Sequence, residues 1–188
     1  MKKICFTLPV LAVFLVFTGI QVQGEANDKN SQSISGKKKV LVVYFSKTGS
    51  TREIAVQIQK ATGGDIFEIQ AVKTYPADYE ALKKVASQEL DSKAKPVLKT
   101  KLENIKSYDV VFIGYPIWWG TFPAPVRTFL SEYNLAGKTV VPFCTHLGSG
   151  FGNSLSDLAK SSQKSTFLEG LAIWGRDVKT SQNKVSEW

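Results

Sequence analysis

The stretch VLVVYFSKTGST, residues 40–51, decides what fold to expect. Its first six residues are continuously apolar, as in a central strand of a parallel sheet that helices cover on both faces. Small and polar residues follow at once, and residues 51–61 then have the apolar stripe of a helix, formed by Ile54, Ala55, Ile58 and Ala61. A buried strand, a tight polar loop and an amphipathic helix in this order predict the start of a βαβ unit.

The same alternation continues along the chain. Further strands are expected at residues 65–71, 110–115, 139–144 and 166–174, with helices at 79–94, 124–133 and 155–162. Residues 180–188 are long enough for barely two more helical turns. This pattern predicts an α/β domain with a doubly wound five-stranded parallel sheet. Ligands of such sheets bind outside the carboxyl ends of the strands, so functional residues are expected in the loops that leave the strands.

Two segments precede this domain, which is expected to cover residues 37–188. Residues 1–24 have a positive start and an apolar run over 4–20, which is typical of a secretory signal peptide cleaved near Gly24. An uncleaved N-terminal anchor is the alternative. Residues 25–36 are small and polar and predict a flexible linker. We therefore expect an exported protein, periplasmic or extracellular.

Charge and composition narrow the function further. The chain has 24 Lys+Arg against 16 Asp+Glu and a net charge of +8, and a basic surface favours anionic partners. Aromatic residues do not alternate with the lysines, so we expect a solvated basic face and no nucleic acid partner, while contact with a membrane surface stays open. Without the leader, Cys144 is the only thiol, which excludes an internal disulfide, and we take it as a buried apolar residue. The single histidine, His146, excludes a histidine metal cluster.

The first loop of interest follows residues 40–45 and consists of Ser46, Lys47, Thr48, Gly49, Ser50 and Thr51. It combines hydroxyl groups with the unpaired N–H groups of a helix N-terminus, which can hold a phosphate without an obligatory salt bridge. The chain lacks G-x-x-x-x-G-K-[ST], and this turn lacks G-x-G-x-x-G, which argues against tightly bound ATP or NAD. The alternative is that these residues only cap the helix and form the turn.

The second loop follows the strand expected at 110–115 and contains Pro116, Ile117, Trp118, Trp119 and Gly120. Tryptophan in a loop between a core strand and a helix favours a flat ligand, because an offset-stacked ring pair gains about 0.5–1.5 kcal/mol beyond area burial. The alternative is that both indole rings fold back onto the domain.

The third loop follows the strand expected at 139–144 and contains Thr145, His146, Leu147, Gly148, Ser149 and Gly150. Its glycines would let backbone amides come close to a ligand. We expect His146 to face solvent, and leave open whether it touches a ligand.

Together these loops match a known pattern. Residues 46–51 resemble the [ST]-x-T-G-x-T phosphate loop of the flavodoxin family, residues 116–120 resemble its aromatic loop over the flavin ring, and residues 145–152 resemble the loop on the pyrimidine side. The resemblance spans residues 38 to about 177. It implies a flavodoxin-like sheet with strand order 2-1-3-4-5 and FMN bound noncovalently by all three loops.

The resemblance leaves three functions open. The protein is expected to be a monomeric FMN-binding electron-transfer protein outside the cytoplasm, with an acidic redox protein as partner because this chain is basic. One alternative is an FMN-dependent reductase of a small acceptor such as a quinone. The other is a non-enzymatic module that binds flavin. In each case the cofactor supplies the redox chemistry and the protein supplies its environment, so no catalytic side chain is expected.

Overall fold

The apolar stretch that opens the domain forms β1 (Val40–Tyr44), a central strand whose last four residues are buried. A computed structural model describes residues 38–188, so the predicted signal peptide and linker lie outside the described residues. β1 pairs with β2 (Asp65–Glu68) on one side and with β3 (Val110–Pro116) on the other. The strand order is β2-β1-β3-β4-β5 and every pairing is parallel, as the resemblance implied.

The far side of the sheet differs from the expectation. The prediction of a single strand at residues 166–174 is wrong. The segment forms two short strands, β5 (Thr166–Phe167) and β6 (Leu171–Trp174), and both pair with β4 (Thr139–His146). Between the two pairings β4 advances from Val140 to Phe143 while its partner advances from Phe167 to Leu171, so the partner carries one extra residue, as in a β-bulge. Pro142, which has no N–H to donate, lies in this interval of β4.

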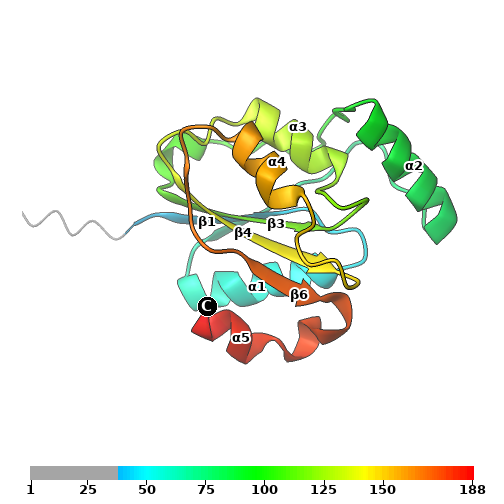
Figure 1. Ribbon diagram of the computed structural model, residues 1–188. Coiled ribbons are helices and arrows are strands. Elements are labelled where there is room, and N and C mark those ends of the chain that lie inside the picture. The colour runs from blue at the N-terminus through cyan, green and yellow to red at the C-terminus, as the bar shows by residue number, and fades with distance from the viewer. Residues whose placement is uncertain (1–37) are drawn as a thin grey trace, which may run out of the picture. The chain divides into compact units, whose positions relative to one another are not determined.

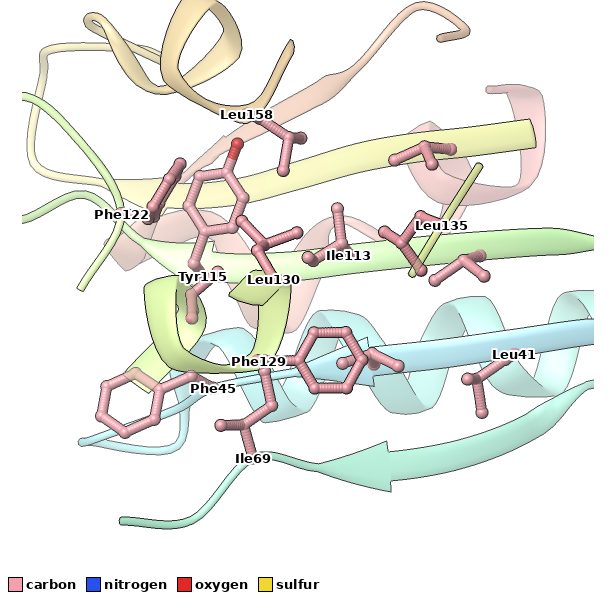
Figure 2. Packing of buried hydrophobic residues seen from close by; sticks show 14 of the residues in the cluster. Leu41, Phe45, Ile69, Ile113, Tyr115, Phe122, Phe129, Leu130, Leu135 and Leu158 are labelled. Atoms are coloured by element: carbon pink, nitrogen blue, oxygen red, sulfur yellow. The ribbon is translucent and has the colours of Figure 1, made fainter. Parts of the chain in front are cut away.

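Helices cover both faces of the sheet (Figure 1). α1 (Ser50–Thr62) and α5 (Gln182–Glu187) lie on one face. α3 (Ala124–Glu132) and α4 (Ser154–Ser161) lie on the other. The 3₁₀ helix η2 (Gly175–Thr180) connects β6 to α5. Residues in a strand alternate between faces, so neighbours in β1 enter different cores. Figure 2 shows the larger core, where the Phe129 ring lies among side chains of the sheet.

The remaining elements lie at the edge beside β2. α2 (Tyr79–Asp91) ends three residues earlier than expected, and Ala86 is its only buried residue. The short 3₁₀ helix η1 (Ile105–Ser107) leads into β3. β2 also ends before the expected 65–71, because the chain then pairs with a later segment through an antiparallel bridge between Ala71 and Leu98. No helix within residues 38–188 has the length and apolar character needed to span a bilayer.

Gly114 in β3 offers a test of how closely this strand packs against the Phe143 side chain of β4. A Cβ atom on Gly114 would lie 2.0 Å from Cζ of the buried Phe143 ring, which cannot withdraw without disturbing its own core. Gly114→Ala is therefore expected to lower the free energy of unfolding by about 1–3 kcal/mol, measured by urea denaturation followed by circular dichroism. Gly175→Ala is the matched control, since its Cβ would meet no atom closer than 3.5 Å. Equal stability of the two variants would contradict this account of the packing.

Candidate functional site

A cavity of about 460 Å³ opens where the loops after β1, β3 and β4 meet. All three loops contribute to its wall, as expected for ligand binding at the carboxyl edge of a doubly wound sheet. The expected residues that line it are Lys47, Thr48, Ser50, Thr51, Pro116, Ile117, Trp118, Trp119, Thr145, His146 and Leu147. Six other expected residues do not line it: Ser46, Gly49, Gly120, Gly148, Ser149 and Gly150.

The first loop turns tightly into the N-terminus of α1. Ser46 Oγ accepts a hydrogen bond of 3.1 Å from the N–H of Gly49, and Gly49 has a φ of 95°, a conformation that glycine adopts without strain. Within residues 38–188, the N–H groups of Lys47, Thr48, Ser50 and Thr51 have no acceptor. Ser46 and Gly49 therefore shape the turn, and the four free N–H groups belong to residues that line the cavity.

A buried hydrogen bond connects the first loop to β4. The Oγ1 atoms of Thr51 and Thr145 lie 2.8 Å apart, and both side chains are almost fully buried. The start of α1 is thus fixed against the end of β4 across the floor of the cavity.

The second loop presents two tryptophans in different ways. Trp118 and Thr121 exchange two backbone hydrogen bonds, and the residues between them, Trp119 and Gly120, both have positive φ, as in a type I′ turn. The Trp118 ring packs edge-on against Phe45 and Tyr75, with centroid distances of 5.6 and 5.2 Å. Trp119 is 52% exposed and donates a 2.9 Å hydrogen bond from Nε1 to the carbonyl of Lys83 in α2. Both tryptophans line the cavity and both also contact the domain. The two alternatives from the sequence, rings that face a flat ligand and rings that fold back onto the domain, therefore apply together.

The third loop corrects the expectation for His146. The residue is the last of β4 and only 7% exposed, so it does not face solvent. Nδ1 accepts a 3.0 Å hydrogen bond from the N–H of Gly148, which leaves the proton of the neutral ring on Nε2. Burial, and to a lesser extent the charge of Lys184, lower the pKa of His146 and favour this neutral form. Leu147 beside it is 79% exposed.

One wall of the cavity was missed by the sequence analysis. It comes from α2, which projects beyond the sheet in the view of Figure 1, and from the start of η2. The additional lining residues are Tyr79, Leu82, Lys83, Ala86 and Gly175. The four α2 residues have the i, i+3, i+4, i+7 spacing of one helix face. This signal was present in the sequence, but a stripe does not reveal whether it faces a core or a cavity.

The charged side chains that line the cavity are all positive. Lys47 and Lys83 are its charged residues, and no carboxylate lines it. Lys83 is partly neutralised by Glu80, whose carboxylate lies 2.9 Å from Nζ. Within residues 38–188 no cluster of His, Cys, Asp and Glu could hold a metal ion. Cys144 is buried as expected, and burial raises the pKa of its thiol to about 12. The cavity thus offers free N–H donors and aromatic surface to an anionic, partly flat molecule.

Comparison with known proteins agrees with this arrangement. A sequence model of the family described as flavodoxin matches residues 39–188. A proposed flavoprotein from Bacteroides eggerthii is 38% identical, with 79% of this chain and 98% of that chain covered and a TM-score of 0.67. Another from Bacteroides uniformis is 35% identical, with 80% and 97% covered and a TM-score of 0.72. A flavoprotein from Lactobacillus acidophilus, solved in complex with FMN, shares the fold at 21% identity, with 79% and 99% covered and a TM-score of 0.64.

The family match extends over the whole described sheet and every loop that lines the cavity. Both Bacteroides proteins are covered over nearly their full length. On these grounds the chain belongs to the flavodoxin family.

Proposed function

We propose that the protein binds FMN noncovalently in this cavity and transfers electrons. The observation that carries the proposal is the set of four free N–H groups at residues 47, 48, 50 and 51, which lie at the edge of the same cavity as two indole rings. N–H groups at a helix N-terminus favour a phosphate, and indole surfaces favour a flat ring system. The family, and the FMN complex of the Lactobacillus acidophilus protein, support the same cofactor.

In this proposal each loop has one task. Residues 47–51 bind the phosphate, with Lys47 available as a charge partner. Trp118 forms a rigid wall for the ring because Phe45 and Tyr75 support it from the side. Of the third loop, Thr145, His146 and Leu147 face the cofactor in this proposal, and Gly148, Ser149 and Gly150 do not, since only the first three line the cavity. FMN supplies the redox chemistry, and the chain supplies an aromatic and carboxylate-free surrounding.

The basic charge bears on the partner. The described part of the chain carries 20 Lys+Arg and 14 Asp+Glu, a net charge of +6. We propose a monomeric electron carrier outside the cytoplasm whose redox partner is an acidic protein, because such a charge attracts acidic surfaces and speeds their encounter.

A second function is favoured by the α2 wall. Tyr79, Leu82 and Ala86 give the cavity an apolar side beyond the three loops of the family pattern. A small aromatic acceptor, such as a quinone, could pack there beside the cofactor. This would make the protein an FMN-dependent reductase.

The phosphate role predicts a difference between two flavins. FMN is expected to bind at least about 100-fold more tightly than riboflavin, because several charge-assisted hydrogen bonds of about 1.5–3 kcal/mol each depend on the phosphate. Thr48→Val is expected to weaken FMN about tenfold and leave riboflavin unchanged, since the Thr48 hydroxyl has no partner within residues 38–188. Quenching of flavin fluorescence measures both affinities.

The control for this experiment is Thr62→Val at the other end of the same helix, where the hydroxyl donates to the carbonyl of Ile58. It is expected to change neither affinity. Equal binding of riboflavin and FMN to the parent protein would refute the phosphate site.

A reduction experiment separates carrier from reductase. The FMN-loaded protein is titrated slowly with dithionite without oxygen, and absorption spectra are recorded. A carrier is expected to take up its two electrons in separate one-electron steps and to show no steady turnover with reduced nicotinamide and a quinone. Rapid two-electron reduction by the nicotinamide with quinone turnover would establish the reductase instead. A protein that binds FMN but resists every donor would be the flavin-binding module.

A further inference from the structure

A basic surface lies on an extended segment outside the cavity. Residues 94–98 are extended, with side chains that alternate between the protein and solvent, and after a bend at Lys99 and Thr100 the exposure still alternates up to Leu102. Leu98 points inward and is 7% exposed. The side chains that point outward are Lys95, Val97, Lys99 and Lys101.

The segment is held firmly to the domain. The N–H of Val72 donates to the carbonyl of Val97 at 2.9 Å, and the N–H of Lys99 donates to the carbonyl of Gln70 at 2.7 Å. Thr128 Oγ1 in α3 donates to the carbonyl of Pro96 at 2.9 Å. The backbone that carries the outward side chains is therefore held in place on the domain and is not a loose loop.

Two valines give this surface an apolar centre. Val72 is 63% exposed and Val97 is 71% exposed, and their backbones are hydrogen-bonded to each other. Lys73 follows Val72 and is also exposed. We call Val72, Lys73, Lys95, Val97, Lys99 and Lys101 the lysine–valine surface. Its exposed valines are neighbours of its lysines in the sequence, and a basic face that served only to keep the protein solvated would not require exposed apolar side chains.

The four lysines of this surface have no carboxylate partner within residues 38–188. Residues 91–106 contain five lysines and only two carboxylates, Asp91 and Glu103. An anionic partner would thus not have to displace an existing salt bridge.

We propose that the lysine–valine surface binds the anionic surface of a lipid membrane. Lysines next to such a surface gain attraction from its negative potential, and exposed valines among them can enter the interfacial region. A single-stranded nucleic acid fits less well, because the surface has no aromatic side chain on which bases could stack. The proposal is independent of FMN and places the domain at a membrane whether or not it carries electrons.

Vesicle binding tests the proposal with the protein made from the complete sequence. Cosedimentation with phosphatidylcholine vesicles, with and without phosphatidylglycerol, gives the partition coefficient. One lysine near an anionic surface contributes about fivefold, so the triple variant Lys95→Gln/Lys99→Gln/Lys101→Gln is expected to partition roughly 100-fold less onto phosphatidylglycerol vesicles. All variants share residues 1–37, so the differences between them report the changed side chains alone.

The matched control neutralises three exposed lysines elsewhere that also form no ion pair within the described residues, Lys60→Gln/Lys164→Gln/Lys179→Gln, and has the same net charge. It is expected to retain most of the binding. Equal loss in the two triple variants would overturn the proposal, because binding would then follow net charge. Failure of the parent protein to prefer phosphatidylglycerol over phosphatidylcholine would overturn it as well.

A second variant distinguishes a membrane from a soluble polyanion. Val72→Ser/Val97→Ser keeps every charge and is expected to weaken vesicle binding several-fold while leaving association with single-stranded RNA unchanged. Unchanged vesicle binding in this variant would refute insertion of the valines. RNA binding that depends on Lys95, Lys99 and Lys101, together with vesicle binding that does not, would identify the surface as a nucleic acid site and reject the membrane.

Discussion

The parallel pairing of β1, β3 and β4 is the constraint on which the site depends. It brings the carboxyl ends of the three strands to one edge, and hydrogen bonds continue it into the loops: the N–H of Phe45 donates to Gly114, and that of Ile117 to Thr145. The buried contact between Thr51 and Thr145 then fixes the start of α1 to β4. The chain goes from β1 to β2 on one side and then returns to β3 on the other side of β1, so the loop after β1 lies at the point where the strand order reverses, which is where doubly wound sheets bind ligands.

This framework permits local features that would otherwise be costly. The free N–H groups after β1 lie where a ligand or water can satisfy them, and Trp119 adopts a positive φ that is uncommon for a bulky residue. The walls differ in how they are held. Trp118 is supported by aromatic neighbours, whereas α2 buries only Ala86 and is tied to the loop through Trp119. Few buried contacts mean low local stability, so α2 is the wall expected to move most easily.

Features that depend on neighbouring residues in the sequence could be predicted, and features that depend on contacts between distant segments could not. β1, its loop and α1 were predictable because the period of the apolar residues and the small residues at the turn lie within a few positions of each other. His146 was misplaced because the length of β4 depends on its pairing with β3 and β6. The break between β5 and β6 needs the partner strand to be known, since the extra residue exists only relative to β4. The stripe of Tyr79, Leu82, Lys83 and Ala86 was visible, but its role as a cavity wall depends on where α2 lies.

The proposed cofactor site depends above all on the backbone N–H groups of the first loop, which would bind the phosphate. Amide nuclear magnetic resonance observes these groups one by one during a titration with FMN. The signals of Lys47, Thr48, Ser50 and Thr51 are expected to shift most strongly, to positions typical of charge-assisted hydrogen bonds, and riboflavin, which lacks the phosphate, is expected not to cause these shifts. Signals in this loop that stay in place while FMN saturates the protein would show that the phosphate lies elsewhere.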